Sequence, residues 1–177
     1  MANILLHICC AVCASSVVET LRNQGFSVTG FFYNPNIHPE KEYIKRLKEM
    51  KKLAQKIKLP LTIGKYDVKR WFFLVKGLED EPESGKRCEV CFRWRLEKTS
   101  QLCEKKKIEF FTTTLTVSPH KSSKVINKVG TNISDKFIEF DFKKKDGFKR
   151  AIELSKIYNL YRQNYCGCIF SIPNSTA

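Results

Sequence analysis

Short apolar segments that alternate with helical patterns constrain the fold of this chain more than any other sequence feature. Residues Asn3–Ile8 form an apolar run typical of a buried strand, and residues 28–33 form a second run rich in β-branched and aromatic side chains. We predict three further strands at Leu61–Ile63, Phe110–Thr113 and 137–140. These segments favour a sheet whose strands are buried between helices.

Amphipathic helices are predicted between these strands. Residues 15–24 place apolar side chains at helical spacing and end at Gly25, a common C-terminal stop. Pro39 begins a long helix, whose apolar face is predicted to contain Ile44, Leu47, Met50, Ala54 and Ile57, with Lys45, Arg46, Lys48, Lys51 and Lys52 on its other sides. The alternation predicts an α/β fold: a Rossmann-like open parallel sheet with helices on both faces, a helical insertion, and a ligand crevice at the carboxyl ends of the strands.

The length of 177 residues fits one domain. We predict a single catalytic domain at 1–171 and a short flexible tail at 172–177. No apolar run approaches the roughly 20 residues that a membrane span needs, so we expect no membrane association. The start, MANILLHICC, lacks the basic segment and cleavage site of a secretory signal. These features predict a cytoplasmic protein in a reducing compartment.

Eight cysteines are unusual for such a compartment, where they serve more often as metal ligands or redox groups than as structural disulfides. They fall into three groups and one outlier, Cys103, to which we assign only packing. The first group, CCxxC, follows the first strand directly. The second, CEVC, opens an amphipathic helix, and the third, CGC, lies near the end of the chain; the grouped positions are Cys9, Cys10, Cys13, Cys88, Cys91, Cys166 and Cys168.

The loop after the first strand of an open α/β sheet usually carries the glycines that hold a phosphate. Here that loop, residues 9–16, contains no glycine, and the chain has neither a GxGxxG nor a Walker pattern. Thiols stand at the position of the nucleotide. We therefore expect no nucleotide binding.

Four of these thiols suit an iron–sulfur cluster. Zinc is commonly held by two C-x2-4-C knuckles, and CEVC could form one, but the adjacent cysteines of the first group are poor zinc-knuckle geometry. Thiolates at four corners suit a [4Fe–4S] cluster, and a helix N-terminus stabilises its negative charge. We favour a cluster held by Cys9, Cys10, Cys88 and Cys91, with a zinc site and buried free thiols as alternatives; Cys13 is left outside this set.

The CGC group has three interpretations. A disulfide between Cys166 and Cys168 would close a strained ring, and strained disulfides are labile, which suits a redox-active pair. The two residues are alternatively further ligands, either of the cluster or of an additional iron ion beside it. The third interpretation is a chance pair on a turn that Gly167 allows.

The net charge of the chain predicts a binding partner. The chain has 32 Lys and Arg against 18 Asp and Glu, a formal net charge of +14. Such an excess on a small domain indicates a polyanion, most commonly a nucleic acid. The alternative is a Lys/Glu-rich surface of the thermophile type. It is less favoured because the acidic residues are far fewer than the basic ones. The basic runs 105–107 and 143–145 are either an RNA track or merely a solvated face.

Five motifs, taken together, resemble the QueH family of epoxyqueuosine reductases. They are LLHICCAVC, NPNIHPEKEY, GKRCEVCFRWRL, TTLTVSPHK and YRQNYCGC, and they occur in the family's order from about Leu5 to Cys168. Val12 stands where the family usually has proline. The resemblance implies an adenine-nucleotide-hydrolase-like α/β fold and the last step of queuosine synthesis, in which the epoxide of epoxyqueuosine at the tRNA wobble position is reduced to the cyclopentene.

The resemblance also implies roles for residues and partners. The family's cluster ligands correspond to Cys9, Cys10, Cys88 and Cys91, and its redox pair to Cys166 and Cys168. The implied partners are the tRNA anticodon arm and an external electron donor. Basic residues next to the motifs are our candidate tRNA contacts: Arg87, Arg93, Arg95, Lys121 and Arg162.

Two questions stay open at this level. The general acid for the leaving oxygen is not assigned; its candidates are His7, His38, Asp67, His120 and Tyr165, of which His7 is more typical of a satisfied core histidine. Two other functional classes also remain. One is a zinc-stapled RNA-binding module without catalysis, and the other is a thiol-based tRNA sulfur-transfer enzyme, which the missing glycine loop disfavours.

Overall fold

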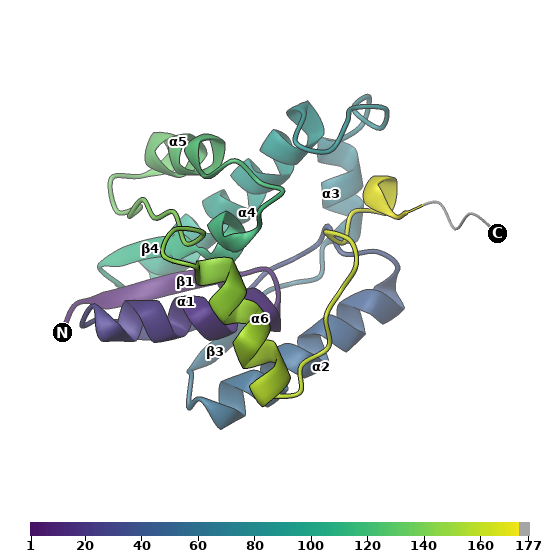
Figure 1. Cartoon of the computed structure of the whole chain (residues 1–177). Helices are drawn as coiled ribbons and strands as arrows, with labels where there is room; N and C mark the ends of the chain where they lie inside the picture. The colour runs from purple at the N-terminus through teal and green to yellow at the C-terminus, as the bar shows by residue number, and fades with distance from the viewer. Residues whose placement is uncertain (174–177) are drawn as a thin grey trace.

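A four-stranded parallel sheet forms the centre of the computed structural model, which describes residues 1–173 (Figure 1). Its strands are β1 (Asn3–Ile8), β2 (Ser27–Phe32), β3 (Leu61–Ile63) and β4 (Phe110–Thr113), in the order β3-β2-β1-β4. This arrangement confirms the predicted α/β fold with a parallel sheet.

β1 is the central strand, and its side chains alternate between two cores. Ile4, Leu6 and Ile8 belong to one apolar cluster, whereas Leu5 belongs to another on the opposite face. Because β1 pairs with β2 on one side and β4 on the other, its backbone is fully engaged. The apolar run read from the sequence is thus a strand buried on both faces, as expected for a parallel sheet covered by helices.

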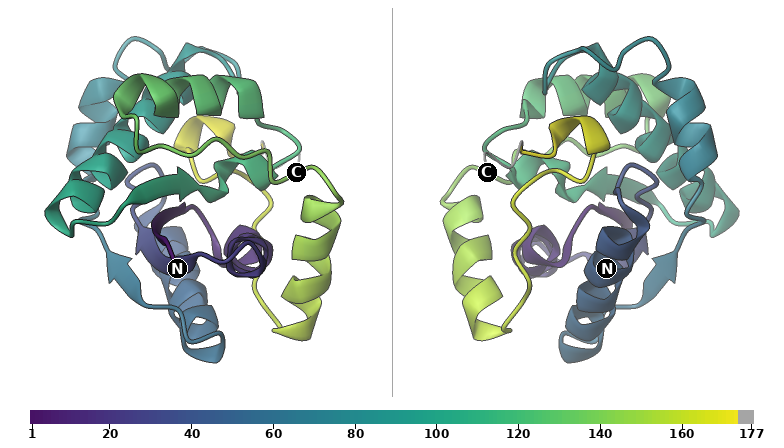
Figure 2. Two further views of the ribbon diagram at one scale, coloured as in Figure 1. Left: turned by 90° about the vertical axis from the view of Figure 1, so that its left-hand side faces the viewer. Right: turned by 90° about the vertical axis from the view of Figure 1, so that its right-hand side faces the viewer.

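Helices cover both faces of the sheet (Figure 2). The core on one face includes side chains of α1 (Ala11–Asn23), α2 (Glu40–Lys56) and α6 (Gly147–Ile157). The core on the other face includes side chains of α4 (Lys86–Lys105) and α5 (Ser123–Ile133). The predicted two-sided covering is confirmed.

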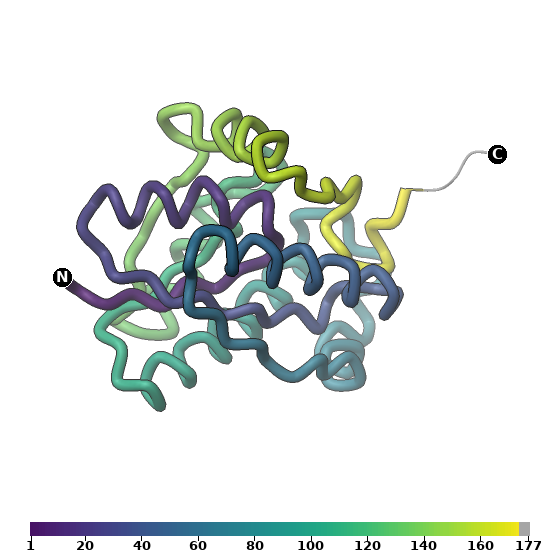
Figure 3. The backbone as a smooth tube through the Cα atoms, turned by 90° about the horizontal axis from the view of Figure 1, so that it is seen from below, coloured from purple at the N-terminus to yellow at the C-terminus, as the bar shows by residue number. Residues whose placement is uncertain are grey.

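Three short elements complete the architecture: α3 (Val68–Leu74) and the 3-10 turns η1 (Thr114–Val117) and η2 (Ile169–Ser171). Both α3 and α4 lie in the segment between β3 and β4. After α6 the chain turns back and runs along α2 towards η2 (Figures 1 and 3). Of the predicted tail at 172–177, residues 174–177 lie outside the described residues.

The predicted strand at 137–140 is wrong. Only Phe137 makes a β-bridge, to Phe111, whose backbone N–H and carbonyl bond to Lys136 and Ile138 on either side. Other hydrogen bonds of this segment come from side chains. The Thr112 hydroxyl donates to the Ile138 carbonyl at 2.9 Å, and the Asn127 amide donates to the Phe140 carbonyl at 3.1 Å. The pairing with β4 is thus a single bridge, and the carbonyls of Ile138 and Phe140 bond to side chains in place of a longer ladder.

The helix predictions need two corrections. The first helix begins at Ala11, four residues before the predicted start, because the Cys10 side chain caps it by accepting the Cys13 backbone N–H. In α2 the predicted apolar face is rotated: Ile44 is 56% exposed, whereas Arg46 is 2% exposed. The returning segment after α6 packs on that side of α2, which the helix periodicity alone does not reveal.

Within residues 1–173, no helix combines the length and the apolar character that crossing a membrane requires.

Candidate metal and thiol site

Seven of the eight cysteines line one cavity of about 410 Å³. They come from three segments that are far apart in the sequence: the end of β1 with the start of α1, the start of α4, and the loop before η2. The cavity therefore lies at the carboxyl end of the sheet, where open α/β folds bind their ligands. The six predicted cluster and redox cysteines are all among its lining residues.

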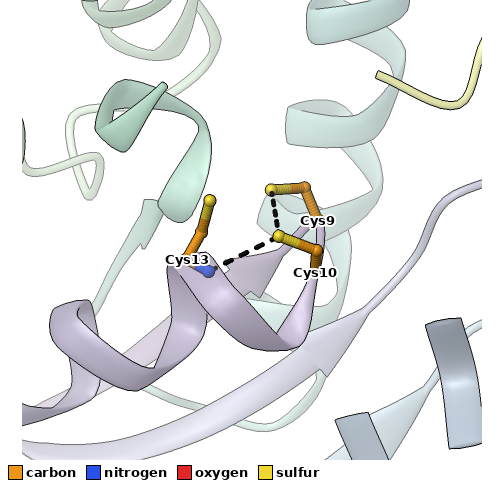
Figure 4. Close-up of side chains that lie close together, drawn as sticks. All are labelled: Cys9, Cys10 and Cys13. Atoms are coloured by element: carbon orange, nitrogen blue, oxygen red, sulfur yellow. Dashed lines mark hydrogen bonds between the residues drawn. The ribbon is translucent and has the colours of Figure 1, made fainter. Parts of the chain in front are cut away.

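Cys9, Cys10 and Cys13 form the closest group of thiols, with all three Sγ atoms within 4.8 Å of one another (Figure 4). Cys9 follows β1, Cys10 is the N-cap of α1, and Cys13 lies in its first turn. The capping geometry folds the third residue after the cap back towards it. Sequence reasoning left Cys13 outside the ligand set, although its spacing from an N-cap was the signal that could have found it.

This group stabilises one thiolate. Hydrogen bonds with the thiols of Cys10 and Cys13 hold the pKa of Cys9 well below its ordinary value. The Thr114 hydroxyl donates to Cys9 Sγ at 3.2 Å and accepts the Cys9 backbone N–H at 3.0 Å. Hydrogen bonds with the thiols of Cys10 and Cys9 raise the pKa of the Cys13 thiol. Cys9 is thus the group that gives up its proton first, as a metal ligand must.

Cys88 and Cys91 open α4, whose N-cap is Gly85. The Ser84 backbone N–H donates to Cys88 Sγ at 3.3 Å, and the helix dipole adds positive potential at the same end. Cys91 Sγ lies 3.8 Å from a guanidinium nitrogen of Arg95. These two thiols line the cavity but are not part of the close group around Cys9.

The CGC loop is held from behind by α2. Arg46 donates from its two terminal nitrogens to the carbonyls of Cys166, at 3.0 Å, and Tyr165, at 3.1 Å. The His38 backbone N–H donates to the Gly167 carbonyl at 2.7 Å. Sequence reasoning missed Arg46 because a basic residue in a lysine-rich helix is normally solvent-exposed.

Cys166 and Cys168 are free thiols in this structure. Cys168 packs with Trp71 and Cys91 in one small apolar cluster, so the third cysteine group adjoins the second. Burial raises the pKa of Cys168 to about 11. Cys168 therefore carries its proton at neutral pH, as the reduced form of a dithiol would.

Three of the five general-acid candidates are occupied elsewhere. His7 contacts the Thr113 hydroxyl at 2.9 Å and the Tyr33 carbonyl at 3.1 Å, and burial lowers its pKa to about 3. His38 bonds through both ring nitrogens, and Asp67 caps α3 by accepting the Arg70 backbone N–H.

The other two candidates, His120 and Tyr165, line the cavity, and the Tyr165 hydroxyl donates to the His38 carbonyl.

The five candidate tRNA contacts differ in their accessibility. Arg93 is exposed, and Lys121 and Arg162 line the cavity at positions that solvent reaches. Arg87 and Arg95 are buried, which corrects the expectation that they offer a surface contact to phosphate. Arg87 donates instead to the carbonyls of Leu78, Glu79 and Glu81 and so holds the loop before α4.

The eighth cysteine is structural, in agreement with the packing role expected for it. Cys103 is fully buried, and its Sγ donates to the Ile108 carbonyl at 3.2 Å. It lies near the opposite end of α4 from Cys88 and Cys91 and does not line the cavity.

Comparisons with known proteins agree with this site. The model of the family described as "Epoxyqueuosine reductase QueH" matches residues 4–174. Proteins of that name from Histophilus somni and Thermotoga maritima are 40% identical over 178 residues and 38% identical over 179 residues. These alignments cover 98% and 97% of this chain, and 73% and 91% of the two relatives.

A relative of the same name from Streptococcus pyogenes is 38% identical over 179 residues, which cover 96% of this chain and 70% of the relative. The family model spans nearly the whole described structure, including all seven cavity cysteines. Because the match extends over almost the full chain and over most of each of these relatives, the chain belongs to the QueH family of epoxyqueuosine reductases.

Proposed function

We propose that this protein is an oxidoreductase that reduces epoxyqueuosine to queuosine at the wobble position of tRNA anticodons. The observation that carries the proposal is the convergence of three cysteine groups on one cavity at the carboxyl end of the sheet. Its relatives are named reductases, so a non-catalytic zinc-stapled module is not favoured.

The chemistry of the donor set fits an iron–sulfur cofactor. The cavity offers thiols from three directions, with a lowered pKa at Cys9 and a helix N-terminus beside Cys88 and Cys91. Thiolates are the ligands that iron–sulfur clusters take in proteins. We assign Cys9, Cys10, Cys88 and Cys91 as the residues that hold a [4Fe–4S] cluster, with Cys13 as the competing ligand on the side of α1. When bound, such a cluster supplies electrons one at a time.

The reaction sets the electron count that the protein must meet. Conversion of an epoxide to an alkene consumes two electrons and two protons and releases the oxygen as water. The thiols of Cys166 and Cys168, on oxidation to a disulfide, release two electrons and two protons. An external electron donor must then reduce the pair again. The alternative assigns both sulfurs as ligands of an additional iron ion, which would act as a Lewis acid on the epoxide oxygen.

His120 is the best placed group to protonate the leaving oxygen. It lines the cavity on the exposed side, and its backbone carbonyl accepts the Ser84 hydroxyl at 3.1 Å, which ties its loop to the start of α4. His7 and His38 have both ring nitrogens engaged. A side chain that acts as a general acid must have a proton free to deliver, and this condition favours His120.

The decisive experiment measures iron, acid-labile sulfide and visible absorbance on anaerobically purified protein, together with the conversion of epoxyqueuosine-containing tRNA by nucleoside analysis. We expect iron, sulfide and conversion. A colourless protein that holds zinc and converts no substrate would support the zinc-stapled module instead. Anaerobic removal of iron by a chelator should abolish conversion, and anaerobic reconstitution should restore it.

Serine variants separate the two roles of the CGC loop. We expect Cys166→Ser and Cys168→Ser to retain the cluster absorbance and the iron content while losing conversion. Loss of one iron per protein in both variants would instead make them ligands of an additional ion. Cys103→Ser is the matched control, because Cys103 is outside the cavity.

A further inference from the structure

Arg95 is a buried cation that pairs with no carboxylate in the part of the chain that the structure describes. Its side chain is 3% exposed, and none of the ion pairs between described residues includes it. One terminal nitrogen donates to Asn34 Oδ1 at 2.8 Å, the other lies 3.8 Å from Cys91 Sγ, and Nε has no hydrogen-bond partner among residues 1–173. A guanidinium cannot lose its proton, so its burial is costly unless a negative charge faces it.

The position of Arg95 is fixed by the sheet. Asn34, which accepts from the guanidinium, donates in turn to the carbonyl of Ile8 at 2.9 Å. Ile8 is the last residue of β1 and directly precedes Cys9. Two successive hydrogen bonds therefore connect Arg95 on α4 to the end of β1 through Asn34, and they hold the guanidinium between the first and second cysteine groups.

The negative charge that would face Arg95 is that of cysteine thiolates in the cavity. Arg95 lines the same cavity as the seven cysteines. Arg87, the other buried arginine on α4, has three carbonyl acceptors and stacks on the Phe170 ring, so its charge is largely taken up by the loop.

We propose that Arg95 is the fixed counter-charge of the thiolate-bound metal centre and a positioning residue that raises its reduction potential. The inference rests on the proposed function, because it requires a redox centre held by the cavity thiols. Reduction adds negative charge to the centre, and a nearby buried cation stabilises the reduced form more than the oxidised one. A hydrogen bond to a ligand sulfur acts in the same direction.

The test is an anaerobic redox titration of the purified holoprotein, followed by the absorbance of the centre. We compare wild type with Arg95→Gln, which removes the charge, and with Arg95→Lys, which keeps it. Arg93→Gln is the matched control, because Arg93 is an exposed cation on the same helix. At a fixed ambient potential we expect Arg95→Gln to lower the ratio of reduced to oxidised centre about tenfold, which corresponds to a fall of about 59 mV for one electron.

Arg95→Lys should recover most of this shift, and Arg93→Gln should leave the potential unchanged. If the Gln variant loses the metal and the Lys variant retains it, the positive charge at position 95 is required for metal binding, which also supports its role as the counter-charge. Equal potentials in wild type and Arg95→Gln, or loss of the metal from both variants, would overturn the inference while leaving the reductase proposal intact. A wild-type protein without iron and sulfide would overturn both.

Discussion

At the scale of single residues, Gly167 shows how closely the CGC loop fits its surroundings. Its φ of +120° lies in a region that side chains rarely adopt. A Cβ atom there would lie 2.9 Å from Ile37 Cγ1 and 3.1 Å from Arg46 Nη1. The glycine between the two cysteines is therefore required both by its backbone conformation and by the absence of space.

We expect Gly167→Ala to lower the free energy of unfolding by about 2–3 kcal/mol, since strain and overpacking act together. Gly25→Ala is the matched control: Gly25 has a φ of +88°, and nothing lies within 4 Å of its added Cβ. The control should cost only about 1 kcal/mol. Urea denaturation of both variants measures the difference, and equal losses would contradict the close fit around the CGC loop.

His38 should make stability depend on pH. Burial lowers its pKa from 6.5 to about 4, and its Nδ1 accepts the Ile169 backbone N–H, which only the neutral ring can do. As the pH falls below 6.5, His38 becomes protonated in the unfolded chain but stays neutral in the folded protein, so stability decreases towards pH 4. We expect a loss of about 1–2 kcal/mol between pH 7 and pH 5 from this residue.

Denaturant titrations at both pH values measure this loss. His7, whose pKa burial lowers to about 3, adds a loss in the same direction. In the variant His38→Gln, the decrease in stability between pH 7 and pH 5 should therefore be smaller, because only the contribution of His7 is left. An unchanged pH dependence in His38→Gln would show that His38 does not contribute.

At the scale of elements, α2 acts as the support of the CGC loop. Arg46 pairs with Glu42 at 2.7 Å and reaches across to the carbonyls that flank Cys166. Tyr161 on the returning segment donates to the same Glu42 carboxylate at 3.1 Å. One buried network thus joins a helix near the start of the chain to the thiols near its end.

Arg46→Met should destabilise the protein by about 2–4 kcal/mol, because it leaves Glu42 without its cation and two partly buried carbonyls without a donor. Lys48→Met is the control, since Lys48 is exposed on the same helix. Urea denaturation measures both variants, and the rate of tryptic cleavage next to Arg162 reports the loosening of the segment. Equal midpoints for the two variants would refute the supporting role.

The strands and the helix starts differ in how well the sequence predicts them. Strands β1, β3 and β4 agree with the predicted bounds, because short runs rich in β-branched, aromatic and aliphatic residues favour strands over helices. The segment 137–140 has the same composition but is held by Thr112 and Asn127, whose contacts come from other elements. The local pattern therefore does not decide whether a segment forms a full ladder, because that depends on the side chains that other elements place beside it.

At the scale of the whole molecule, the two basic runs lie in different places. Residues 105–107 lie at the C-terminal end of α4, which carries Cys88 near its other end, so Lys105 lies roughly 25 Å from that cysteine. Residues 143–145 are near the cavity, because Lys143 Nζ donates to the carbonyl of Lys121, a lining residue, at 2.9 Å. Only the second run adjoins the site where the wobble nucleotide would enter.

We expect the double substitution of Lys144 and Lys145 by Gln to weaken tRNA binding and to reduce the slope of log K against log[salt] by about 1–2. Substitution of Lys105 and Lys106 by Gln should leave the slope nearly unchanged. Both pairs are exposed, so the change in net charge is matched. A salt titration that is almost flat for wild type would reject a track of several phosphate contacts.

The amino-acid sequence by itself determined the class of the fold and the three cysteine groups, because these depend on periodicity and on the order of elements along the chain. Only the tertiary structure decided that the groups share one cavity and that Arg95 is buried beside them. The physical reason is that burial and charge pairing arise where distant segments pack together. A short-range pattern can place a cysteine at the end of a strand, but the side chain that faces it belongs to another element.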